Sequence, residues 1–168
     1  MPHPRSALSR RRFLGAAAAA AFAAADFPRS QPPPREDRPR KKLAVVTTAY
    51  YYLSHAYHIG GRFLHGYLRD GRMHYPDFAV AGMYVAQQKD GDLSRELSKK
   101  HGFPLYPDPA GALTLGGDRL AVDGVLLIGE HGDYPFNARA QKLYPRFELF
   151  QKIVEVFKKS GRGVPVFC

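Results

Sequence analysis

The sequence has 168 residues and a single cysteine, Cys168, so no intramolecular disulfide can form. Its formal net charge of +10 is concentrated near the start of the chain, and residues 43–168 contain only 15 basic and 12 acidic residues. Binding to nucleic acid needs a basic face on the folded domain itself, so this distribution of charge argues against a nucleic-acid partner.

Residues 1–25 have the pattern of an export signal. The segment Ser9–Leu14 holds consecutive arginines followed by Phe-Leu, and the alanine-rich apolar run after it ends in Ala23-Ala24-Ala25. We predict a cleavable twin-arginine signal peptide, the twin-arginine export machinery as a partner, and a periplasmic location. The apolar run is shorter than the roughly 18 residues that a spanning helix needs, so no stable membrane span is expected after cleavage. The alternative is a chance basic N-terminus before an alanine-rich helix.

Residues 26–42 are rich in proline and arginine. Such a segment cannot bury enough apolar surface to fold, so we predict a disordered linker. Residues 43–168 remain, which is enough for one domain with its own core.

The first part of this domain alternates strands with helices. Ser54 and Asp92 are expected helix caps, Asp108-Pro109 is expected to start a helix, and Asp70-Gly71 is expected to stop one. In chain order, we predict a strand at 43–48, a helix at 54–69, a strand at 78–85, a helix at 93–101, an edge strand at 104–106 and a helix at 109–115.

The most informative segment is Val125–Ile128, four consecutive large aliphatic residues between two glycines. Such a short run without polar alternation predicts a strand buried on both faces. A helix at 137–160, bent at Pro145, and a strand at 164–167 follow. The order predicts an α/β, three-layer Rossmann-like domain with a mostly parallel sheet in the strand order 3-2-1-4-5, incomplete at its C-terminus.

Two short sequence segments of this domain resemble motifs of a known family. Lys100–Asp108 reads Lys-His-Gly-Phe-Pro-Leu-Tyr-Pro-Asp, and Val122–Ile128 reads Val-Asp-Gly-Val-Leu-Leu-Ile. In this order they resemble the nucleotide-binding half of the glucose-fructose oxidoreductase, inositol dehydrogenase and MocA (Gfo/Idh/MocA) family, over roughly residues 43–167. The resemblance implies a Rossmann domain, NAD or NADP as cofactor, and a carbohydrate-type substrate.

The sequence departs from that family at two places. The segment Thr47–His55 lacks the glycines that let a backbone approach a pyrophosphate. Val164 stands where the family has a catalytic lysine, so no catalytic residue is assigned and this chain alone is expected to be inactive. The alternative function is a non-catalytic Rossmann-like binding or structural protein that has lost dinucleotide binding. The sequence leaves open whether this chain forms a homo-oligomer.

The candidate binding residues follow the first strand and the buried strand, because parallel strands place such loops at one edge of the sheet. Glu130, His131 and Asp133 are also candidate ligands of a divalent metal, with His55 and His58 able to approach them. A solvated loop is the alternative reading of these polar residues. The candidate cofactor-binding residues are Thr47, Thr48, Ala49, Ser54, His55, Gly129, Glu130 and His131.

Tyrosines 50–52 are candidates for stacking on a sugar or nicotinamide ring, although packing beneath a helix is the stronger expectation for them. Tyr144 and Arg146 are candidates for contact with an anionic ligand, against a plain role on a helix surface. A Ser-His-Asp hydrolase is not expected, because the sequence has no Gly-x-Ser-x-Gly elbow.

Overall fold

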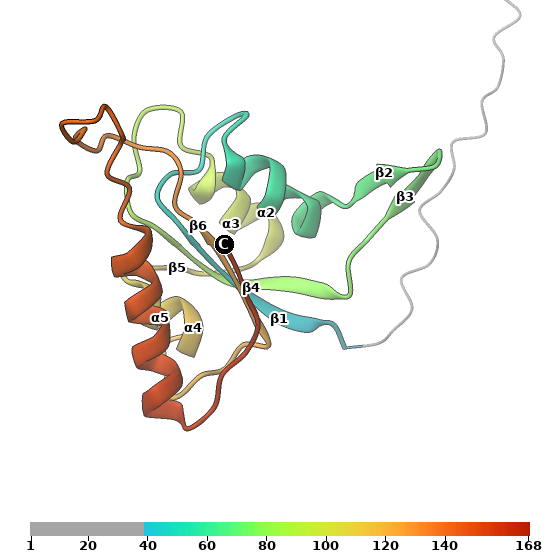
Figure 1. The fold of residues 1–168 in the computed structure, drawn as a ribbon. Helices are drawn as coiled ribbons and strands as arrows, with labels where there is room; N and C mark the ends of the chain where they lie inside the picture. Colours follow the sequence, from blue (N-terminus) through green and yellow to red (C-terminus); the bar gives the residue numbers. More distant parts are fainter. Residues whose placement is uncertain (1–38) are drawn as a thin grey trace, which may run out of the picture. The chain divides into compact units, whose positions relative to one another are not determined.

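The computed structural model describes residues 39–168. The predicted signal peptide at 1–25 and most of the predicted linker at 26–42 therefore lie outside the described residues. The described part is an α/β domain with a five-stranded parallel sheet in the order β5-β4-β1-β6-β7, flanked by helices (Figure 1). In chain order this is the arrangement 3-2-1-4-5, so the predicted fold class and strand order are confirmed.

Loops separate the strands and helices of the described residues, and the longest of these loops is 129–145, between β6 and α5. The sheet strands are β1 (Lys41–Thr47), β4 (Phe78–Val85), β5 (Leu105–Tyr106), β6 (Gly124–Ile128) and β7 (Val166–Phe167). The helices are α2 (His55–His65), α3 (Ser94–His101), α4 (Pro109–Thr114) and α5 (Arg146–Ser160), and β2 (Tyr67–Arg69) pairs with β3 (Arg72–His74) in a separate hairpin.

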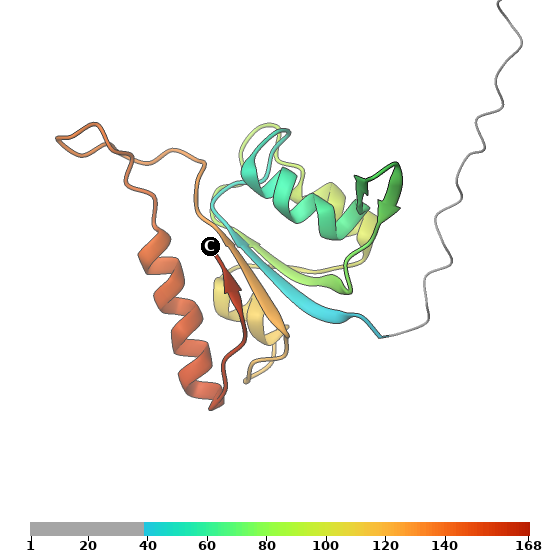
Figure 2. The ribbon, with the colours of Figure 1, turned by 45° about the vertical axis from the view of Figure 1, so that its right-hand side comes forward.

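Helices cover both faces of the sheet, so the neighbouring strands β1 and β6 are buried on both sides. Along β1, Leu43 and Val45 pack toward α2 and α3, whereas Ala44 and Val46 pack toward α4 and α5. The residues of β6 alternate in the same way, which is the two-residue period of a strand. Figures 1 and 2 show α2 and α3 on one side of the sheet and α4 and α5 on the other. The prediction of a doubly buried central strand is confirmed.

Two helix starts form as their sequences predict. The Ser54 side chain accepts a hydrogen bond from the amide of Tyr57 at the start of α2. The Asp108 side chain accepts one from the amide of Gly111 at the start of α4, directly before Pro109. Each cap satisfies an amide that has no partner within its helix.

The first predicted helix is wrong at its C-terminal end. It stops at His65 rather than Arg69, because Gly66 has a φ of 76° and a Cβ there would lie 2.6 Å from the His74 carbonyl oxygen. Asp70 and Gly71, which we expected to stop the helix, instead form the turn of the β2–β3 hairpin. Their φ values of 51° and 73° match the turn with two left-handed central residues that joins tight hairpins.

The predicted helix at 137–160 is wrong at its start, because α5 begins only at Arg146. The Asn137 side chain accepts hydrogen bonds from the amides of Arg139 and Gln141, and this local turn competes with a helix. Two smaller corrections concern boundaries. Strand β1 begins at Lys41, inside the predicted linker, and α3 starts at Ser94 with no capping bond from the Asp92 side chain to a backbone amide.

Within residues 39–168, none of the helices combines the length and the apolar character needed to cross a membrane.

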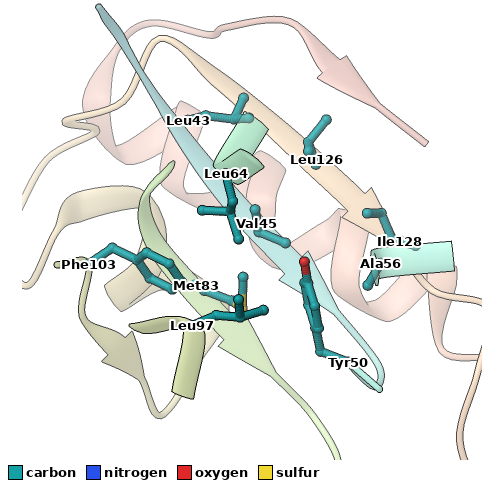
Figure 3. Packing of buried hydrophobic residues seen from close by; sticks show 10 residues of the cluster. All are labelled: Leu43, Val45, Tyr50, Ala56, Leu64, Met83, Leu97, Phe103, Leu126 and Ile128. Atoms are coloured by element: carbon teal, nitrogen blue, oxygen red, sulfur yellow. The ribbon is translucent and has the colours of Figure 1, made fainter. Parts of the chain in front are cut away.

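Tyr50 is a large side chain of the core beneath α2 (Figure 3). It is 1% exposed, and its ring would lie 3.4 Å from a Cβ at Gly60 of α2, so glycine leaves room for it. Its hydroxyl has no hydrogen-bond partner among the described residues. Burial, together with the nearby Tyr57, raises the pKa of this hydroxyl, so it stays protonated.

We predict that Tyr50→Phe leaves the free energy of unfolding unchanged or raises it by about 1 kcal/mol, because it removes an unpaired buried hydroxyl. Tyr50→Ala should lower it by about 3–5 kcal/mol through the cavity that it leaves. Urea unfolding measures both, with Tyr52→Phe at an exposed position as the control. A clear loss of stability in Tyr50→Phe would mean that the hydroxyl has a partner.

Candidate functional site

The candidate site lies where the loops after β1 and β6 meet. Strands β1 and β6 pair in parallel, with Thr47 opposite Ile128, so both loops leave the same edge of the sheet. The chain order of the strands reverses between β1 and β6, and open α/β sheets bind their ligands at such a point. The candidate site is therefore formed by these two loops.

Buried threonines hold the two loops together. The Thr47 hydroxyl lies 2.9 Å from the carbonyl oxygen of Ile128, to which it donates a hydrogen bond. The amide of Thr48 also donates to that carbonyl, and the Thr48 hydroxyl accepts a hydrogen bond from the amide of His131. Thr47 and Thr48, like Ala49 and Ser54, are buried. Their side chains fix the backbone of the site rather than line an open surface.

Aromatic side chains from both loops meet above this backbone. The Tyr51 hydroxyl lies 2.8 Å from Nδ1 of His131, and the two rings meet edge to face. The imidazole of His55 stacks on that of His131, with ring centroids 4.7 Å apart and an interplanar angle of 28°. The three rings thus join the loop after β1, the start of α2 and the loop after β6.

Glu130 connects this group to α5. One carboxylate oxygen lies 3.0 Å from Nδ1 of His55, and the other accepts a hydrogen bond of 2.9 Å from Nη2 of Arg146. The Nε of Arg146 also donates to the carbonyl oxygen of Gly129. A Cβ at Gly129 would lie 3.0 Å from Cγ of Arg146, so glycine permits this close approach. We call Tyr51, His55, Glu130, His131 and Arg146 the switch-point cluster.

Asp133 lies apart from that cluster. Its carboxylate pairs with Lys89, in the loop after β4, and its backbone exchanges two hydrogen bonds with the Gln87 side chain. The pairing with Lys89 lowers the pKa of Asp133. Hence the three predicted metal ligands Glu130, His131 and Asp133 do not converge, and within residues 39–168 no three histidine, cysteine, aspartate or glutamate side chains are placed so that they could hold a metal ion. A divalent metal stays a prediction from the sequence.

The residues after β1 do not fit a dinucleotide pyrophosphate. In a Rossmann domain this group approaches a glycine-rich backbone at the start of the first helix. Here the ring of Tyr50 fills the space beneath α2, and the Ser54 side chain already bonds the amide of Tyr57. The carboxylate of Glu130 contacts His55, the first residue of α2, and pairs with Arg146, so both partners are already engaged where a phosphate would need free donors.

The cavity at this edge is small. A pocket of about 50 Å³ lies between the loops after β1 and β4, which is less than the 300–1,000 Å³ of most ligand pockets. A larger groove, of about 360 Å³, lies between α4 and α5. It is lined by Asp108, Pro109, Ala110, Lys152, Glu155, Val156 and Lys159 and lacks a comparable group of interacting polar side chains. A ligand of the switch-point cluster would therefore lie across the open edge of the sheet.

Of the predicted binding residues, the structure brings together His55, Glu130 and His131. Gly129 takes part through its carbonyl oxygen, which accepts a hydrogen bond from Arg146. The structure does not bring in His58, whose ring contacts Tyr57 instead. Sequence reasoning assigned Arg146 mainly to a helix surface, and it overlooked Gln87 and Lys89. A signal was available for these two, because they follow the second parallel strand and so reach the same edge.

We found no match to this chain among known protein families, curated proteins or solved structures.

The electrostatics of the cluster predict a pH dependence of stability. Burial lowers the pKa of His131 from its usual value of 6.5, and the neighbouring His55 and Lys142 add to this effect, which outweighs the opposing charge of Glu130. Burial and Lys100 likewise lower the pKa of His65. The unfolded chain then binds more protons than the folded one, so both histidines contribute stability that is present above pH 6.5 and lost as the pH falls.

We predict that the free energy of unfolding decreases as the pH is lowered from about 7 to 5, and that His131→Gln makes this decrease smaller. Urea unfolding across this range measures the slope, which is independent of any constant loss of stability in the variant. His65→Gln should remove the contribution that His65 makes to this pH dependence. An unchanged slope in His131→Gln would contradict the assignment.

Proposed function

We propose that residues 39–168 form a binding domain for a carbohydrate-type small molecule, with the switch-point cluster as its site. The observation that carries this proposal is the convergence of five polar or aromatic side chains at the point where the strand order reverses. The loop after β1, α2, the loop after β6 and α5 supply them, so the arrangement depends on the tertiary fold rather than on one local turn.

The chemistry of the cluster matches a polyhydroxyl ligand. The Glu130 carboxylate accepts hydrogen bonds and the Arg146 guanidinium donates them, and both are more than a third exposed. Tyr51 is 38% exposed and Tyr52 is 65% exposed, so aromatic rings border the polar groups. Rings of this kind can cover the apolar face of a sugar while their hydroxyl groups bond to its polar edge.

This proposal also takes the dinucleotide to have been lost. The buried Tyr50 and the Glu130 carboxylate support that view, because they stand where a pyrophosphate would need backbone amides and positive charge. Export through the twin-arginine route is part of the proposal. It rests on the sequence of residues 1–25 alone.

The second candidate is the nucleotide-binding half of an NAD(P)-dependent oxidoreductase of the Gfo/Idh/MocA type. The observation that favours it is the parallel sheet in the order β5-β4-β1-β6-β7, with α2 starting at the carboxyl end of β1. In that case, NAD or NADP would bind at the residues after β1 and β6, and a carbohydrate would be its substrate. This candidate is the weaker one, because the residues after β1 do not fit a pyrophosphate.

For the first candidate, we predict that at least one of D-glucose, D-galactose and myo-inositol binds the full-length chain. Glu130→Gln should weaken this binding about tenfold, because a hydrogen bond to a charged group contributes about 1.5–3 kcal/mol. Tyr51→Ala should weaken it as well. Isothermal titration calorimetry measures the affinities, with Glu155→Gln, in the groove between α4 and α5 and outside the switch-point cluster, as the matched control. Equal affinities in all four proteins would contradict the site.

For the second candidate, the melting temperature of the chain with and without NAD or NADP is decisive. A ligand at about 100 times its dissociation constant stabilises the folded state by about 2.7 kcal/mol. We predict no shift for either nucleotide. A rise of several degrees in the wild-type chain would favour the oxidoreductase over the binding domain.

A further inference from the structure

The imidazole of His55 is held in one orientation by contacts on two sides. Its Nδ1 lies 3.0 Å from the Glu130 carboxylate, and its plane stacks on the ring of His131. Its backbone is fixed too, because the preceding residue Ser54 is buried and caps α2. A side chain whose ring and backbone are both fixed is preorganised for chemistry.

Glu130 is itself immobilised. Arg146 donates one hydrogen bond to a carboxylate oxygen of Glu130 and another to the carbonyl oxygen of Gly129. One guanidinium therefore binds both the side chain and the adjacent backbone of this loop. The other carboxylate oxygen is left to face His55. A carboxylate beside Nδ1 favours the tautomer with the proton on that nitrogen, which leaves the lone pair on Nε2.

The second histidine of the stack is engaged differently. Nδ1 of His131 faces the Tyr51 hydroxyl, and its Nε2 is buried without a partner among the described residues. His55, in contrast, has a side chain that is 54% exposed. Within residues 39–168, no protein group hydrogen-bonds Nε2 of His55. Of the two imidazoles, His55 is therefore the one that a ligand can reach.

We propose that the switch-point cluster is a catalytic acid–base site, in which Nε2 of His55 is the base and Glu130 and Arg146 are positioning residues. This inference rests on the proposed function for the identity of the natural ligand, a polyhydroxyl compound. A hydroxyl proton of the ligand passes to Nε2, the alkoxide keeps the electron pair of the broken O–H bond, and the imidazolium faces the Glu130 carboxylate. A carboxylate in that place stabilises the charge that develops on the ring.

The test uses p-nitrophenyl acetate, because the same lone pair attacks its carbonyl carbon. The bond to p-nitrophenolate breaks, and water then hydrolyses the acetylimidazole to acetate and free imidazole. We expect the full-length chain to release p-nitrophenolate faster than N-acetylhistidine amide at the same concentration. All proteins carry Cys168→Ser, because the exposed thiol would also be acylated.

Three variants define the result. His55→Gln should lower the rate about tenfold or more, since a positioned base contributes about 10²–10⁴-fold. Glu130→Gln should lower it less, because the imidazole remains but its orientation is lost. His58→Gln, one turn further along α2 and exposed, is the matched control and should keep the wild-type rate. Thermal unfolding followed by circular dichroism checks that each variant folds.

A spectroscopic readout separates positioning from general structure. With ¹⁵N-labelled histidine, we expect His55 of the wild-type chain to show the Nδ1–H tautomer, and Glu130→Gln to shift it toward Nε2–H. A wild-type rate in His55→Gln, a wild-type rate no higher than that of N-acetylhistidine amide, or the same tautomer in Glu130→Gln would each overturn the proposal. No sugar is present in these assays, so their failure is distinct from a failure of carbohydrate binding.

Discussion

The parallel pairing of β1 with β6 is the constraint on which the rest of the domain depends. Both strands are covered on both faces, so their registers are fixed by two cores at once, and a slip by one residue would exchange the two faces. This pairing sets Thr47 opposite Ile128 and brings Thr48 within hydrogen-bond distance of the His131 amide. The apolar core therefore determines the geometry of the polar cluster, because the cluster is built on the residues that directly follow the paired strands.

The sheet has the strand order of a Rossmann-like fold, but the residues after β1 and β6 differ from the glycine-rich turn that binds a dinucleotide in such folds. A glycine-rich turn leaves empty space and free amides for a pyrophosphate, but the turn after β1 carries Tyr50, which fills the space beneath α2. The carboxylate of Glu130 also lies at this edge of the sheet, where it is paired with Arg146. Fold and function are separable in this way, since the sheet order follows from the hydrophobic pattern and the ligand chemistry follows from a few loop residues.

Much of the fold could be predicted from the sequence, because local chemistry and hydrophobic period agree there. Ser54 and Asp108 form the expected caps, and Val125–Ile128 forms the buried strand. The errors lie where a single residue decides the local structure, as at Gly66 with its positive φ and at Asn137 with its side-chain hydrogen bonds to the backbone. The sequence also placed His55, Glu130 and His131 at one edge of the sheet. It could not predict the stacking of His55 on His131 or the hydrogen bond from Arg146 to the Gly129 carbonyl oxygen, because both depend on side-chain orientations that strand order leaves open.

The most direct test of the central claim is a map of backbone amide shifts in the ¹⁵N-labelled full-length chain, titrated with the sugar that binds best. We expect the largest shifts at Tyr51–His55 and Gly129–His131, with smaller ones at Arg146, because these segments carry the switch-point cluster. Shifts confined to the groove between α4 and α5, around Lys152 and Lys159, would contradict it.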